Sequence, residues 1–110
     1  MPSREEKLRA ICLLVEGEED VDGERLRFFQ SIVIYALDFQ DAERRVTVEL
    51  ARRGASLISI DPEETREVEP DTVKFGGADP EAGIVGKSGR IWVKPGLFRR
   101  IGSRLRRIWH

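Results

Sequence analysis

The stretch GERLRFFQSIVIYALDFQ, residues 23–40, decides the fold because its pattern fits both a helix and a strand. At helical spacing, polar residues gather on one side and apolar residues on the other, and only Ile34 is misplaced. Against a helix, Ile32 to Tyr35 form a β-branched and aromatic cluster that also suits a strand. We favour a wide-faced, mostly buried helix over residues 23–40, and a strand remains the alternative.

The residues before this stretch predict another helix. Ser3 and Glu6 have the spacing of a capping box, which places the helix start at Arg4. Gly17 is positioned to end the helix. The apolar residues between these points share one face at helical spacing: Leu8, Ile11, Cys12 and Val15.

Two β-hairpins are predicted after the decisive stretch. Apolar and other residues alternate over 46–51 and a second apolar run covers 57–60, with Gly54 between them in the turn. A competing interpretation makes 42–53 a helix capped by Asp41 and stopped by Gly54, although a consecutive Val-Thr-Val weakens it. Short apolar runs at 84–85 and 91–93 flank Gly86-Lys87-Ser88-Gly89 and predict the second hairpin. Thr72 to Phe75 is a further, short strand candidate.

The last sixteen residues, Pro95 to His110, predict a basic amphipathic helix. They contain five arginines and no carboxylate side chain. The apolar residues Leu97, Ile101, Leu105 and Ile108 follow a helical rhythm along one side. Such a helix needs an anionic or apolar partner.

These patterns predict a single α+β domain of 110 residues. Two N-terminal helices would pack on a small antiparallel sheet of hairpins, and a basic amphipathic C-terminal helix would follow. We divide the chain into an acidic α+β body, residues 1–94, and the basic helix, residues 95–110.

The net charge of −1 hides a strong asymmetry along the chain. Residues 1–82 hold 11 Lys and Arg against 20 Asp and Glu, whereas residues 83–110 hold 8 basic residues and no acid. The basic end can fold back on the acidic body of its own chain or of a neighbouring copy. Alternatively, it can face a polyanion such as nucleic acid or anionic lipid.

Few residues are suited to catalysis or to binding a cofactor. Cys12 is the only cysteine, so the chain can form neither an internal disulfide nor a cysteine-based zinc site. It lies in an apolar run and is expected to be a buried, inert thiol in a reducing, cytoplasmic setting. The only histidine is the terminal His110, where a rigid general base is not expected. We therefore expect no enzyme and no cofactor. The longest apolar run, 32–37, is too short to span a bilayer.

Two partial motifs are incomplete. Glu18 to Gly23 matches the first half of an EF-hand calcium loop, but Phe29 stands where a bidentate Glu is needed. Gly83 to Ser88 resembles a phosphate-binding P-loop, yet only two residues separate its glycines and a strand-like run follows. A solvated acidic turn and a hairpin turn are the favoured interpretations.

The sequence thus predicts a non-enzymatic interaction or assembly module whose Arg-rich C-terminal helix docks onto an anionic protein surface, possibly of a second copy. A sequence-nonspecific nucleic-acid-binding protein is the alternative, in which Trp92 and Trp109 either stack on bases or pack in the core. A peripheral membrane-surface binder is the second alternative. The candidate partner-binding residues are Arg99, Arg100, Arg104, Arg106, Arg107, Lys87, Arg90, Lys94 and Trp109.

Overall fold

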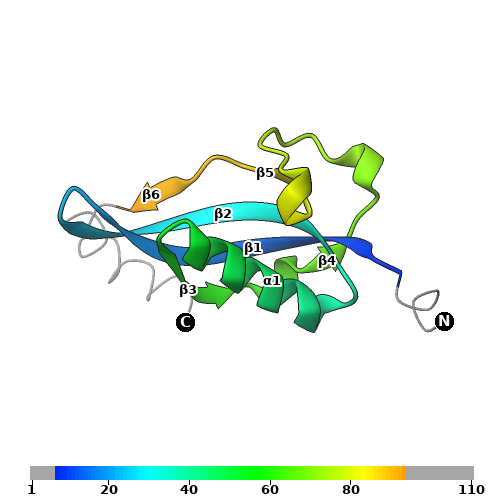
Figure 1. Cartoon of the computed structure of the whole chain (residues 1–110), viewed down its shortest axis with the longest axis horizontal. Coiled ribbons are helices and arrows are strands. Elements are labelled where there is room, and N and C mark those ends of the chain that lie inside the picture. Colours follow the sequence, from blue (N-terminus) through cyan, green and yellow to red (C-terminus); the bar gives the residue numbers. More distant parts are fainter. Residues whose placement is uncertain (1–6, 94–110) are drawn as a thin grey trace, which may run out of the picture.

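The computed structural model describes residues 7–93 and shows an antiparallel sheet with one α-helix against one of its faces (Figure 1). The strands are β1 (Arg9–Val21), β2 (Glu24–Ala36), β3 (Ala55–Ile60), β4 (Arg66–Glu67), β5 (Ile84–Lys87) and β6 (Ile91–Val93). The helix α1 (Phe39–Arg52) connects β2 to β3, and short 3-10 helices cover Pro62–Glu64, Pro70–Thr72 and Pro80–Ala82. The sheet order is β3-β1-β2-β5, with β4 also paired to β1 and β6 also paired to β2.

The hairpin of β1 and β2 forms the centre of the sheet. Its turn consists of Asp22 and Gly23, which both have positive φ, at 52° and 84°. A two-residue turn of this kind twists in the same sense as the strands it joins, which is why Asp-Gly favours hairpins. The turn pairs Val21 with Glu24 and sets the register that ends with Arg9 opposite Ala36.

The main core lies between the sheet and α1. Alternate residues of a strand point to the same face, so one set from β1 and one from β2 meet the helix. The fully buried members include Phe28, which has no exposed surface. The buried core residues on this side are Ile11, Leu13, Val15, Phe28, Ile32, Ile34, Ala36, Ala42, Val46, Leu50, Ala55 and Ile84.

A smaller core covers part of the opposite face of the sheet. Ala10, Cys12 and Val33 are buried there. The partly buried residues packed on them are Val68, Val73 and Val85. Burial raises the pKa of the Cys12 thiol, which confirms the prediction of a buried cysteine.

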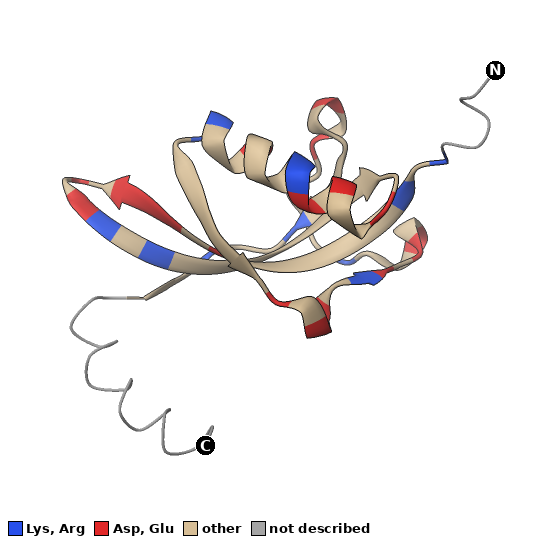
Figure 2. Cartoon of the chain, turned by 90° about the horizontal axis from the view of Figure 1, so that it is seen from below, with Lys and Arg blue, Asp and Glu red and all other residues tan. Residues whose placement is uncertain are grey.

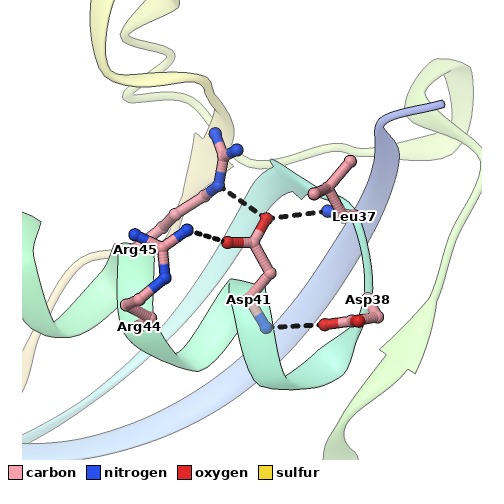
Figure 3. Close-up of polar contacts among 5 residues, drawn as sticks. All are labelled: Leu37, Asp38, Asp41, Arg44 and Arg45. Carbon is pink, nitrogen blue, oxygen red and sulfur yellow. Dashed lines mark hydrogen bonds and ion pairs between the residues drawn. The ribbon is translucent and has the colours of Figure 1, made fainter. Parts of the chain in front are cut away.

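Asp38 and Asp41 fix the start of α1 (Figure 3). The Asp38 carboxylate caps the helix by accepting a hydrogen bond of 2.7 Å from the Asp41 amide. The buried Asp41 carboxylate accepts a hydrogen bond of 2.9 Å from the Leu37 amide, and it pairs with Arg44 and Arg45. The Leu37 amide is the main reason that the pKa of Asp41 lies below its usual value.

The expected pair of N-terminal helices is wrong, because β1 and β2 occupy the corresponding stretches. In β1, Ile11, Leu13 and Val15 alternate toward α1 while Cys12 is buried on the other face. Burial on both faces makes the sequence apolar at nearly every position, and such a run also satisfies helical spacing. The residues of the expected capping box, at 3–6, lie outside the described part of the chain.

Both expected hairpins are also wrong. Residues 46–51 belong to α1, so the competing helix over 42–53 is the correct interpretation, although it begins earlier, at Phe39. β5 and β6 pair with successive parts of β2 and not with each other. At the strand candidate 72–75, the structure has the end of a 3-10 helix followed by a loop. The expected C-terminal helix, 95–110, lies outside the described residues.

Replacement of Gly17 by Ala is expected to destabilise the fold by about 1–3 kcal/mol through overpacking. A Cβ at Gly17 would lie 2.6 Å from Cζ of Phe28 and 3.0 Å from the carbonyl oxygen of Ser56. The measurement is urea unfolding of the full chain. Gly89→Ala is the matched control, because a Cβ there meets nothing within 4 Å. Equal stability of the two variants would contradict the packing.

Asp41→Asn is expected to lower stability at pH 7 by about 1–2 kcal/mol, because hydrogen bonds to a charged acceptor are lost. The folded pKa of Asp41 is lowered, so its contribution is present above the unfolded value and is lost as pH falls through the folded value. The difference from the parent chain should therefore shrink below about pH 4. Urea unfolding at pH 7 and pH 3 measures it, with Glu43→Gln as the exposed control. A pH-independent difference would refute the assignment.

Candidate functional site

A hollow of about 270 Å³ lies between α1 and the β5 side of the sheet. We call it the helix–β5 pocket. Its apolar wall consists of Ile32, Leu50 and Ile84, which are also core residues. Its polar wall consists of Glu19, Gln30, Glu49, Arg53, Lys87 and Arg90.

Backbone pairing of β5 with β2 brings Lys87 into this pocket. Lys87 stands opposite Ile32 in the register, so its side chain lies on the α1 side of the sheet. The next residue locks the register, because the Ser88 amide donates to the Ser31 carbonyl at 2.9 Å. Buried Gln30 adds a hydrogen bond of 2.8 Å from its Nε2 to the Ser88 carbonyl. These bonds fix where the Lys87 side chain begins.

Arg53, in the cap at the end of α1, is neutralised by two carboxylates. Its Nε donates to Glu49 at 2.7 Å, and a second nitrogen donates to Asp79 at 2.9 Å. The hydrogen bond to Glu49 is the main cause of a raised Arg53 pKa. Glu49 lies one helical turn before Arg53, and its side chain is itself mostly buried. Arg53 is therefore a fixed cation at one end of the pocket.

Arg90 also lines the pocket and is held by a carboxylate and by two rings. It pairs with Glu19 of β1. Its guanidinium lies 4.0 Å from the centre of the Phe28 ring and 5.4 Å from that of Trp92. The two rings meet edge to face, with centroids 5.3 Å apart. A guanidinium over an aromatic face is a favourable cation–π contact. Arg90 therefore packs against the two rings and also pairs with Glu19.

Lys87 differs from both arginines. Burial lowers the pKa of Lys87, and the nearby Arg53 charge lowers it further. Among residues 7–93, no carboxylate forms an ion pair with its ammonium group. The pocket thus contains one partly desolvated cation without an ionic partner in the described part of the chain.

A second surface lies on the opposite side of the sheet, at the end of the hairpin remote from Arg9 (Figure 2). We call it the distal face. Side chains alternate between the two faces of the sheet along β1, β2 and β6. Those on the distal face are Leu14, Glu16, Glu18, Asp20, Arg25, Arg27, Phe29 and Ile91. Ile91 is 69% exposed, which is unusual for a large apolar side chain in a sheet.

Ion pairs cross the distal face between β1 and β2. Arg25 binds Glu18 at 3.0 Å and Asp20 at 3.3 Å, and Arg27 binds Glu16 at 3.2 Å. Two of the carboxylates of the failed calcium pattern, Glu18 and Asp20, are therefore engaged by arginine. The distal face holds three carboxylates against two arginines, and Asp22 and Glu24 beside the turn add two more, whereas Glu19 lies on the α1 side and pairs with Arg90.

The structure brings together two of the nine candidate partner-binding residues, Lys87 and Arg90, in the helix–β5 pocket. The other seven lie outside the described residues: Lys94, Arg99, Arg100, Arg104, Arg106, Arg107 and Trp109. Glu49 and Arg53 were missed by the sequence reasoning. Their spacing of four residues is a helix signal that follows from the competing interpretation of 42–53.

Comparisons of the chain with protein-family models, with curated proteins and with solved structures give no match in any of the three. No helix within residues 7–93 has the length and the apolar character needed to cross a bilayer. The description of the site therefore rests on its own geometry.

Arg90→Lys is expected to destabilise the chain by about 1 kcal/mol, because an ammonium cannot reproduce the planar stack on Phe28. Urea unfolding of the full chain gives the change in free energy. Arg52→Lys serves as control, since the Arg52 side chain is 70% exposed and pairs only at 3.5 Å. An equal loss in the two variants would argue against a structural role for the stack.

Proposed function

We propose that the chain is a non-enzymatic protein-interaction module that assembles with itself. The basic segment, residues 95–110, would dock on the distal face of a second copy. We place this role in the cytoplasm, where a lone buried thiol such as Cys12 stays reduced. The observation that carries the proposal is the presence, in one chain, of exposed Ile91 on a sheet face beside an acidic hairpin end and of a basic, apolar-striped segment.

Charge supports this choice of occupant. Residues 7–93 carry 12 Lys and Arg against 18 Asp and Glu, whereas residues 95–110 carry five arginines and no acid. Opposite potentials on two surfaces steer their association and disfavour other partners. Each copy has both a distal face and a basic segment. If each of two copies docks its segment on the other, both distal faces and both segments gain a partner.

Apolar contact supports the same occupant. The distal face combines exposed Ile91 with partly buried Phe29 and Leu14, and acids flank this strip. An amphipathic helix presents an apolar stripe edged by charge, which is the complement of such a surface. The helix-in-groove mode of recognition therefore suits the residue types on both sides.

Nucleic-acid binding by the same segment remains the alternative function. It has less support because Arg90 is paired with Glu19 and Lys87 lines a pocket, so neither enlarges an open basic surface. A phosphate-binding segment with five arginines would give a slope of about −4 to −5 in log affinity against log salt. Binding to anionic lipid is the second alternative, for which no described residue adds support.

Sedimentation equilibrium of the full chain tests self-assembly. The parent chain should associate at low salt, and Ile91→Lys should weaken association about tenfold or more by placing a cation on the distal face. Replacement of Arg104, Arg106 and Arg107 by Ala should have the same effect from the other side. Val48→Lys is the matched control, because Val48 is 53% exposed on α1 and lies away from the distal face.

Three outcomes would contradict self-assembly. These are a monomeric parent chain at high protein concentration, an Ile91→Lys variant that associates normally, and an equal loss in the Val48→Lys control. Duplex DNA binding with the expected salt slope by a monomeric chain would favour the alternative function instead.

A further inference from the structure

The three cations of the helix–β5 pocket are unequally neutralised. Arg53 binds Glu49 and Asp79, and Arg90 binds Glu19, while Lys87 forms no ion pair within the described residues. Arg53 and Arg90 disfavour the charged form of Lys87, whereas the charges of Glu49 and Asp79 favour it. The three cations are matched in number by Glu19, Glu49 and Asp79, but the Lys87 ammonium has no direct ion pair within the described residues. It is therefore the cation of the pocket that is left to bind a ligand.

The pocket has the size and the walls of a site for a small ligand. Its volume of about 270 Å³ lies just below the usual range of ligand pockets, which begins at about 300 Å³. Ile32, Leu50 and Ile84 supply an apolar side that excludes water, and Gln30 and Lys87 supply polar groups opposite. A macromolecule does not fit such a volume, whereas a metabolite of a few heavy atoms does.

We propose that the helix–β5 pocket binds a small oxyanion, a carboxylate or a phosphate, whose oxygen accepts a hydrogen bond from the Lys87 ammonium. Arg53 and Arg90 are held in the wall of the pocket by their own carboxylates, so the Lys87 ammonium is the group that binds the oxyanion. This inference is independent of residues 95–110 and of self-assembly, because every residue that forms the pocket lies within 19–90.

The energetic reason lies in the desolvation of Lys87. Without a ligand, the ammonium has lost part of its hydration and gained no ionic partner, which costs free energy. A bound oxyanion replaces that hydration with a charge-assisted hydrogen bond. Binding therefore stabilises the charged form of Lys87, and the pKa of its ammonium should rise when the pocket is filled.

Isothermal titration calorimetry of the full chain tests the proposal with sodium phosphate and with sodium acetate, against sodium chloride at equal ionic strength. Saturable binding of phosphate alone or of acetate alone identifies the class of oxyanion. Lys87→Met should weaken that binding about tenfold or more, since a charged hydrogen bond is lost. Lys74→Met, at an exposed lysine outside the pocket, should leave it unchanged.

A second measurement does not depend on how the variant folds. The chain has four lysines, so the ε-carbon resonance of Lys87 can be followed by NMR through a pH titration. The pKa of Lys87 should rise in saturating phosphate or acetate. The proposal is overturned if neither ion binds, if Lys87→Met binds like the parent chain, or if the Lys87 pKa does not respond. None of these readouts depends on oligomeric state, so failure here is separate from failure of self-assembly.

Discussion

The two-residue turn of Asp22 and Gly23 is the constraint on which the rest of the structure depends. It requires positive φ at both positions, and this geometry fixes how every residue of β1 stands opposite β2. A slip of one residue would move each side chain to the other face of the sheet. Phe28 would then leave the core, and the contact surface for α1 would be lost.

The same register places different kinds of residue on the two faces of the hairpin. Toward α1, it aligns the core with Gln30 and Glu19, which lead into the helix–β5 pocket. On the opposite side, it sets Arg25 and Arg27 beside carboxylates of β1 and leaves Ile91 exposed. Two independent surfaces thus arise from one strand pairing, and a ligand at one need not disturb the other.

Part of this structure was accessible from the sequence. Asp22-Gly23, flanked by apolar and charged alternation, is a strong hairpin signal, and Glu49 with Arg53 supports the helix that the structure has. The runs 57–60, 84–85 and 91–93 were predicted as strands and lie in β3, β5 and β6, although in other pairings, and a strand was the alternative for β2. β1 was missed because burial on both faces hides its alternation. The pocket was beyond prediction for another reason. It depends on β5 pairing with β2 across a long connection, and no local pattern shows that Lys87 faces Arg53.

The proposed docking of residues 95–110 on the distal face of a second copy can be tested at position 91. Photo-crosslinking tests it most directly, with a benzophenone side chain in place of Ile91 and a mixture of isotopically labelled and unlabelled full chains. Docking between two copies should give crosslinks from position 91 to peptides within 95–110, with labelled and unlabelled chains joined. Crosslinks confined to a single chain, or only to residues 7–93, would contradict it.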